Sequence, residues 1–499
     1  MRWSKSQRST GSRGVRRLGT ALLAVALAPA LSACFILGME KPDAALDIPA
    51  GYRAGPHDAD AALPSVIWWR RFGSKELTLL IEEALTSNLD ILVAIARIVQ
   101  ADANARVAGA ALLPAVDLKG NATRSRPSQA TSTVSTSSTG SSERVSFSAS
   151  LSASYEIDFW GKNRATLRAF EETAAASRFD REVVALTTVV TVANTYFTVL
   201  ASQDRLRVAR NNLAAASRVY RLIEERFQAG TASALDTAQQ ESVVNTKRAA
   251  IPPLVQTLQQ NIATLAVLVA RPPERVNVRG GSMNQIAIPR ITPGLPSDML
   301  GQRPDIREAE AQLEAANANV YAARAALFPS ITLTGEGGTQ SRLLRNLLRP
   351  ESLFYSVAAG LTQPIFEGGR LRGAVDLQKG KQDELLQLYR KAVINGFADV
   401  DRALIAVQQT TARERLQLEV VRSSRRAFEI AETRLREGTI DLVTVLNTQQ
   451  TLFQAEDTLA QARLARLLAV TSLYQALGGG WEKPPKKALL APQSPPPTP

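Results

Sequence analysis

The sequence of 499 residues contains one cysteine and one histidine. These numbers exclude a disulfide within the chain, a Cys/His metal site and a CxxC redox pair. A histidine-dependent catalytic triad would need His57, which stands in the polar stretch Gly55-Pro56-His57-Asp58 and is expected to lie in a solvated loop. We therefore expect no enzymatic activity and no bound metal.

Acidic and aromatic residues are also scarce. Lys and Arg number 59 against 46 Asp and Glu, which gives a formal charge of +13, and aromatic residues make up 5% of the chain. Six of the basic residues precede residue 34, where there is no acid, so the rest of the chain carries +7. Nucleic-acid binders cluster basic residues on one face. Because this charge is diffuse, we expect no nucleic-acid partner.

The longest hydrophobic run near the N-terminus is short. It covers 18–31, about 14 residues, whereas a membrane-spanning helix needs roughly 20. A basic segment precedes it and Leu31-Ser32-Ala33-Cys34 ends it, a pattern that resembles a bacterial lipoprotein signal. We predict a signal peptide over 1–33, with S-diacylglycerol and N-palmitoyl groups on Cys34 and an extended segment over 34–72. Phe35, in place of an aspartate, favours the outer membrane. An ordinary secretory signal with a chance cysteine is the alternative.

No later segment is expected to span a membrane as a helix, but four segments alternate with a period of two residues. They lie at about 115–125, 145–157, 330–340 and 352–363. In the second, every odd position is apolar and every even position is polar, over 13 residues. This length and this pattern are typical of strands with one face in lipid and the other in water.

Four strands are too few to close a membrane barrel, since single-chain barrels need about eight. An open sheet in lipid would leave two edges of unpaired backbone groups, each costing several kcal/mol. The strands therefore predict an oligomer, with eight strands from two copies or twelve from three.

Most of the remaining chain predicts helices. Two long helices are expected over 162–228 and 370–436, about 100 Å each, and each is followed by a shorter return helix, over 233–270 and 441–478. Further helices over 75–113 and 303–328 precede the two strand pairs. Pro252 and Pro253 should kink the first return helix.

The chain also repeats itself. The element Ala-Ala-Leu-Leu-Pro ending at Pro114 recurs, with Phe in place of the second Leu, ending at Pro329, and Arg226–Thr231 recurs as Arg434–Thr439. We expect two structural repeats, over 73–270 and 303–480. A linker over 271–302 should join them, and a disordered Pro-rich tail should follow over 481–499.

The chain resembles the TolC-like outer-membrane factor family, in its lipoprotein branch that serves tripartite multidrug efflux. The resemblance rests on Trp68-Trp69 and Phe72, on the Leu-Leu-Pro element, and most specifically on 291–300 leading into Arg303-Pro304-Asp305-Ile306. It implies an α+β membrane protein: a homotrimer whose 12-stranded β-barrel continues into a periplasmic α-helical barrel with an equatorial domain. The implied partners are outer-membrane lipid, a periplasmic membrane-fusion adaptor and an inner-membrane transporter of the RND type.

The resemblance also implies roles for the two helical hairpin turns. In the family the second turn carries the periplasmic constriction, which would correspond here to Val443 and Asn447. Asn447 departs from the acidic residue that is frequent there. Asp441 could supply the charge or simply cap the helix, and Asp236 pairs with Ser233 as a helix cap or faces the gate. The adaptor would dock on Arg226, Gly230, Thr231, Arg434, Gly438 and Thr439.

Two other functions fit the sequence less well. An exit duct for type I protein secretion or for metal export belongs to the same family, but the lipoprotein signal and the single histidine and four methionines favour efflux. A structural coiled-coil lipoprotein of the envelope would have no membrane-spanning strands, and the period-two segments argue against it.

Overall fold

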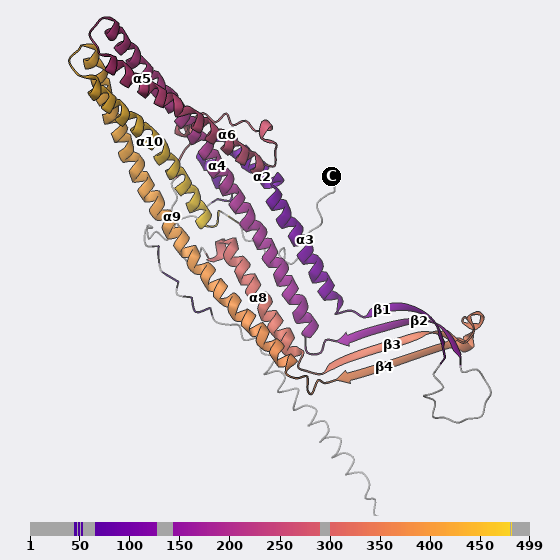
Figure 1. Cartoon of the computed structure of the whole chain (residues 1–499). Helices are drawn as coiled ribbons and strands as arrows, with labels where there is room; N and C mark the ends of the chain where they lie inside the picture. The colour runs from indigo at the N-terminus through magenta and orange to yellow at the C-terminus, as the bar shows by residue number, and fades with distance from the viewer. Residues whose placement is uncertain are drawn as a thin grey trace, which may run out of the picture. The chain divides into compact units, whose positions relative to one another are not determined.

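Figure 1 shows the computed structural model of the chain. The structure describes residues 44–46, 48–49, 51–52, 65–126, 143–289, 300–479 and 481. The predicted signal peptide with Cys34, His57, the linker signature at 291–299 and the tail beyond 481 lie outside the described residues. The chain forms two compact units. One contains 101–173 and 312–386, and the other contains 45–100, 174–311 and the chain from 387 onward.

The first unit contains one antiparallel sheet of four strands in the order β1-β2-β3-β4 (Figure 1). The strands are β1 (Ala115–Ser125), β2 (Arg144–Ile157), β3 (Ser330–Ser341) and β4 (Leu353–Thr362). Each begins and ends within one residue of its predicted range. The two strand pairs, far apart in sequence, join through β2 and β3, so both repeats contribute to one sheet.

The long helices α4 (Lys162–Gln228) and α9 (Arg370–Arg436) have the predicted bounds, 67 residues each. The second return helix is α10 (Leu442–Ala476). The first return arm is divided at Ala250 into α5 (Ala234–Ala249) and α6 (Ile251–Leu268). Pro252 and Pro253 lie in the first turn of α6, where a proline's missing N–H breaks no helical hydrogen bond. The return arm is thus divided two residues before Pro252, and the kink itself stays a prediction.

The single helix expected over 75–113 is wrong. The structure has α2 (Lys75–Ser87) and α3 (Leu89–Ala110), separated by Asn88 in an extended conformation. The Asn88 side chain accepts hydrogen bonds from the backbone N–H groups of Asp90 (2.9 Å) and Ile91 (3.2 Å), and donates one to the carbonyl oxygen of Leu268 (2.8 Å). Asn88 therefore caps α3 and ties it to the end of α6. The helix expected over 303–328 is α8 (Pro304–Ala325).

An aromatic cluster forms the core of the second unit. Trp68 of η1 (Trp68–Phe72) stacks on Tyr474 of α10 at 4.5 Å between ring centroids, and Phe72 packs on Phe197 of α4 at 5.1 Å. The aliphatic residues of α4 between Val189 and Ala201 complete this core. Such a cluster joins segments from both repeats.

The expectation that no later segment is long and apolar enough for a membrane helix needs a correction. By length and composition α4 contains one such stretch, and 56% of it is buried inside the protein. The apolar residues of α4 pack on η1, α2, α6 and α10 in the core, so their hydrophobicity is accounted for by burial within the chain.

The segment that links the repeats is held by two carboxylates, the partly buried Glu76 and the buried Asp204. Glu76 accepts hydrogen bonds from the N–H groups of Arg279 (2.9 Å) and Gly280 (3.0 Å) and from the Tyr196 hydroxyl (3.2 Å). Burial raises the pKa of Tyr196 to about 12, so the hydroxyl stays a donor at physiological pH. Asp204 of α4 likewise accepts from the N–H of Met283, at 3.0 Å, in η4 (Met283–Gln285).

Candidate functional site

The sheet has one apolar and one polar face. The register places Val116, Ala153, Gly335 and Val357 in one row across the four strands. Further rows on the same face contain Leu118, Leu151, Gly337 and Tyr355, and Ile157, Ile331 and Leu361. Leu118, Leu151, Tyr355 and Val357 are all more than half exposed. The sheet thus presents an uncovered apolar face, as expected for contact with lipid.

The opposite face contains hydroxyl, amide and charged side chains. One of its rows joins Asp117, Ser152, Glu336 and Ser356, and the adjacent position on β1 on this face is Lys119. The alternation is visible in the sequence, but this acidic row is not. Finding it requires the register between β2 and β3, which are 173 residues apart at their nearest ends.

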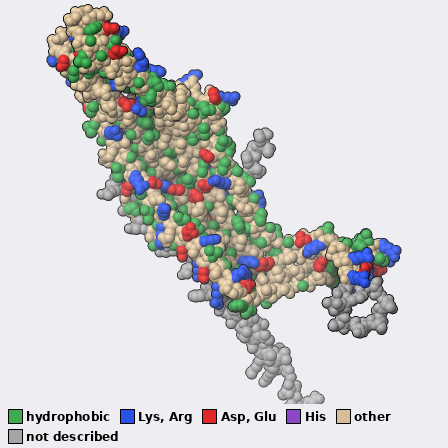
Figure 2. Space-filling model, in the orientation of Figure 1, with side chains coloured by type: hydrophobic (Ala, Val, Ile, Leu, Met, Phe, Trp, Pro, Cys, Tyr) green, Lys and Arg blue, Asp and Glu red, His purple; other side chains and the backbone are tan. Residues whose placement is uncertain are grey.

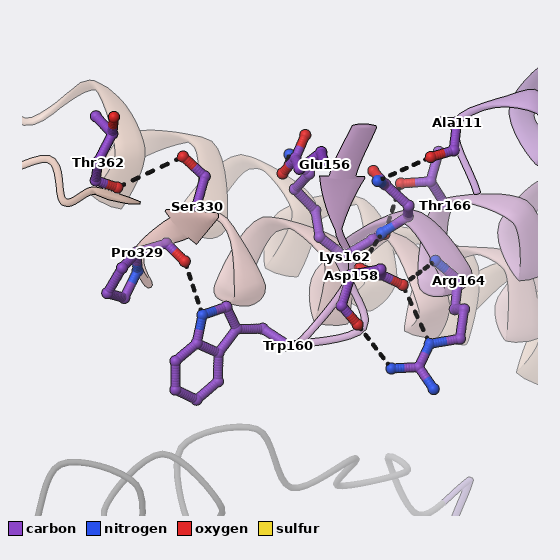
Figure 3. Close-up of polar contacts among 11 residues, drawn as sticks. Ala111, Glu156, Asp158, Trp160, Lys162, Arg164, Thr166, Pro329, Ser330 and Thr362 are labelled. Atoms are coloured by element: carbon purple, nitrogen blue, oxygen red, sulfur yellow. Dashed lines mark hydrogen bonds and ion pairs between the residues drawn. The ribbon is translucent and has the colours of Figure 1, made fainter. Parts of the chain in front are cut away.

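Aromatic side chains lie where the strands meet the helices. Figure 3 shows the Trp160 indole donating a hydrogen bond to the carbonyl oxygen of Pro329, at 2.8 Å. Trp160 stacks on Phe328 at 4.8 Å, and Phe159 beside it is 62% exposed. Phe159-Trp160 recurs 206 residues later as Ile365-Phe366, and Phe366, the repeat counterpart of Trp160, is 88% exposed. Aromatic residues at the end of an apolar strand face are typical of the membrane–water interface.

The first turn of α4 is fixed by Asp158. Its carboxylate accepts hydrogen bonds from the N–H groups of Asn163 and Arg164, both at 2.9 Å, and pairs with the Arg164 guanidinium (Figure 3). Burial raises the pKa of Asp158, but the hydrogen bonds and the charge of Arg164 outweigh this effect and leave the pKa below its ordinary value. The charged carboxylate thus holds the chain as it passes from β2 into α4.

The first hairpin tip joins α4 to α5. Gly230 adopts a left-handed conformation (φ 74°), and the Thr231 N–H donates to the carbonyl oxygen of Arg226 at 2.8 Å. The Ser233 hydroxyl then accepts from the N–H of Asp236, and the Asp236 carboxylate accepts from the N–H of Ser233. Asp236 is therefore a capping residue, as its spacing predicted.

The second hairpin tip, between α9 and α10, repeats this geometry. Gly438 has φ 75°, and the Thr439 N–H donates to Arg434 at 2.9 Å. Asp441 caps α10 by accepting from the N–H of Thr444 at 2.8 Å. Hydrogen bonds from the Thr444 side chain and N–H lower the pKa of Asp441. Of the two roles considered for Asp441, the cap is present in the structure, and the gate charge stays a prediction.

The two tips touch. A Cβ at Gly438 would lie 3.2 Å from the Arg226 guanidinium, so the side chain of the first tip lies over the backbone of the second. Beneath them the tip core contains Ile223 of α4, Phe428 and Leu435 of α9 and Val445 of α10. The six residues predicted for adaptor docking therefore belong to two adjacent turns over one core.

Of the predicted gate residues, Asp441 at the N-cap of α10 and Val443 and Asn447 on α10 are exposed, and Asp236 on α5 is half-buried. Val443, at 54% exposure, has as its repeat counterpart Leu235 on α5, at 65%. Leu235 was not among the predicted gate residues, although the repeat offset of 208 residues between the tips points to it. Figure 2 shows hydrophobic, basic and acidic side chains mixed over this end of the molecule.

Known proteins resemble this chain over most of its length. A model of the outer membrane efflux protein family matches residues 80–271 and 295–479. The pyoverdine export outer membrane protein OpmQ of Pseudomonas aeruginosa is 41% identical over 461 residues, which cover 91% of this chain and 96% of the relative. The toluene efflux pump outer membrane protein TtgC of Pseudomonas putida is 32% identical over 461 residues, which cover 90% of this chain and 94% of the relative.

Solved structures agree with these relatives. The outer-membrane channel OprN superimposes with a TM-score of 0.82 at 25% identity, over 89% of this chain and 100% of that chain. CusC, described as forming a transmembrane channel, superimposes with a TM-score of 0.77 at 27% identity, over 88% of this chain and 99% of that chain. With an amphipathic four-stranded sheet, aromatic residues at its end and two long helical hairpins, the chain belongs to the outer membrane efflux protein family and is the outer-membrane channel component of an efflux system.

Proposed function

We propose that three copies of this chain close a 12-stranded barrel and conduct small molecules passively across the outer membrane. The observation that carries this proposal is the sheet itself. Within the described residues, the outer edges of β1 and β4 have no partner strand, and unpaired edges in lipid cost several kcal/mol for each orphaned polar group. Pairing β1 of one copy with β4 of the next removes both edges. The energy for transport then comes from a partner, and the chain itself catalyses no reaction.

The two faces of the sheet contact different surroundings, lipid on one side and water on the other. The face with Leu118, Leu151 and Val357 contacts lipid, and the face with Asp117 and Glu336 lines the aqueous lumen. A lumen of this kind conducts polar and amphipathic solutes without binding them tightly.

The N-terminus adds a second attachment to the membrane. Cys34 carries the S-diacylglycerol and N-palmitoyl groups after removal of residues 1–33. Several acyl chains on one residue anchor a protein stably, at about 0.8 kcal/mol per buried methylene. Metabolic labelling with a palmitate analogue tests this assignment, since label must appear in the wild type and disappear in Cys34→Ser.

The partners are a periplasmic membrane-fusion adaptor and an inner-membrane transporter, for which the RND type is our proposal. The adaptor docks on the two tips. A further contact is offered by a cavity of about 490 Å³ that lies along α4 and α5, away from the turns themselves, and is lined by Arg218, Arg221, Arg248 and Glu241. The surplus of arginine at this cavity suits an adaptor helix with acidic residues.

The proposed cargo is a small molecule. The relatives named above are called a pyoverdine export protein and a toluene efflux protein, and both names refer to small molecules. An exit duct for type I protein secretion or for metal export is the alternative.

A charged residue placed on the proposed lipid face tests which face of the sheet contacts lipid. Leu151→Lys, in a strain that lacks the gene, should fail to restore dye efflux and outer-membrane assembly, because a Lys near the bilayer midplane costs about 2–4 kcal/mol. The matched control is Ser152→Lys, one residue along β2 and on the lumen face, and it should restore efflux. Full rescue by Leu151→Lys, or loss in both variants, would contradict the assignment of faces.

A further inference from the structure

A second cavity, unrelated to the tips, lies within the helical unit. It has a volume of about 600 Å³, the size of a small-molecule site, and is bounded by α4, α9, α10 and η4. Its apolar lining consists of Val208, Met283, Leu418, Val421, Leu459 and Ala460. The walls come from both repeats and from the segment between them.

Five arginines and three carboxylates also line this cavity. The arginines are Arg207, Arg415, Arg425, Arg463 and Arg466, and the carboxylates are Asp204, Glu414 and Glu456. With every group charged, the lining therefore carries a net charge of +2.

The carboxylates are already engaged. Glu456 accepts from Arg425 at 2.6 Å, and Asp204 pairs with Arg207. Glu414 is shared by two arginines, with Arg466 at 2.9 Å and Arg463 at 3.6 Å. Each acid is thus neutralised by at least one arginine, and no carboxylate of the lining is left for the surplus positive charge.

The surplus positive charge of the cavity lining lies on two arginines, Arg415 and Arg466. Among the described residues Arg415 has no ion-pair or hydrogen-bond partner, and it is exposed at the cavity. The Nε of Arg466 is buried and has no hydrogen-bond partner, while its Nη1 forms an ion pair with Glu414. A buried N–H without an acceptor is unfavourable, and arginine presents several donors in a fork that matches an oxyanion.

We propose that this cavity binds an amphipathic organic anion: a molecule with two carboxylate, sulfonate or phosphate groups on an apolar body. The acidic groups pair with Arg415 and with the free donor of Arg466, and the apolar body contacts Leu418 and Leu459. Because the walls belong to α4, α9, α10 and η4, the bound anion fastens the two repeats together. Nothing in this site depends on closure of the barrel.

Isothermal titration calorimetry with naphthalene-1,5-disulfonate tests the proposal on the purified full-length protein in a nonionic detergent at low salt. We expect saturable binding of one anion per chain, and a rise of the unfolding temperature with ligand concentration, because ligands that bind the folded state stabilise it. Arg415→Ala should weaken binding at least fivefold. Since Arg415 has no ion-pair partner, this substitution should leave the unfolding temperature without ligand unchanged.

Arg413→Ala is the matched control, because it removes the same charge from α9 at a residue that does not line the cavity. It should bind as the wild type does, and the uncharged naphthalene-1,5-diol should not bind. Absence of saturable heat, equal weakening in both variants, or equal binding of the diol would overturn the proposal. Dye efflux by the same variants keeps the two proposals separate, since a failed channel leaves anion binding unaffected.

Discussion

At the residue scale, a few polar side chains determine where helices begin. Asn88 divides one helical stretch in two, Ser233 and Asp236 cap α5, and Asp441 caps α10. Each satisfies backbone N–H groups that the first turn of a helix leaves without partners. The capping residues of the tips lie beside the proposed gate, so cap and gate functions must be separated by substitution.

Two substitutions separate them at Asp441. Asn caps helices about as well as Asp, so Asp441→Asn should keep the first turn of α10 intact, whereas Asp441→Ala should open it. Hydrogen exchange of residues 442–445 measures this difference, and faster exchange is expected in the Ala variant alone. Equal exchange in the wild type and both variants would show that the observed hydrogen bond does not hold the turn.

The pH dependence of the tip follows from the same carboxylate. Hydrogen bonds from Thr444 lower the pKa of folded Asp441 below its ordinary value of 3.8. The part of the stabilisation that depends on the charge of Asp441 is therefore complete above the unfolded pKa and is lost as the pH falls through the folded pKa. Hydrogen exchange at the tip, corrected for intrinsic rates, should be constant from pH 5 to 8 and increase only in stronger acid. A transition near neutral pH would contradict the cap.

At the element scale, the sheet depends on one close approach between β2 and β3. A Cβ at Gly338 would lie 2.2 Å from the carbonyl oxygen of Ala149 and 2.6 Å from the Cα of Ser150. Gly338→Ala should therefore push the strands apart and lower the amount of assembled protein in the outer membrane. Gly335→Ala is the control on the same strand, because nothing lies within 4 Å of its added Cβ. Normal assembly of the Gly338 variant, measured by heat-modifiable migration, would contradict this packing.

Most of the strands and helices could be predicted from the sequence. A period of two residues over 145–157 and apolar residues spaced three and four apart over 162–228 arise from local geometry, which neighbouring residues determine. The break at Asn88 was missed because Asn is compatible with helices, turns and caps, and contact with Leu268 settles the choice. The acidic row of Asp117 and Glu336 and the arginines around Glu414 were missed because they bring together residues far apart in the chain.

At the scale of the whole molecule, the acidic row predicts ion selectivity. In the proposed trimer, three copies would place six carboxylates from Asp117 and Glu336 on the lumen wall, partly offset by Lys119. Glu336→Gln should reduce the preference for cations over anions, measured as a shift of reversal potential in a KCl gradient across a planar bilayer. Glu351→Gln, in the segment between β3 and β4, should change it less. An unchanged reversal potential in Glu336→Gln would place this residue outside the conduction path.

The central claim is that one chain supplies a third of a closed channel. It is tested most directly by the mass of the purified protein in detergent, determined by light scattering with correction for bound detergent. The account predicts a single species with three times the mass of one chain and the sheet content of β1–β4. A stable monomer that retains this sheet content and needs no partner edge would contradict it.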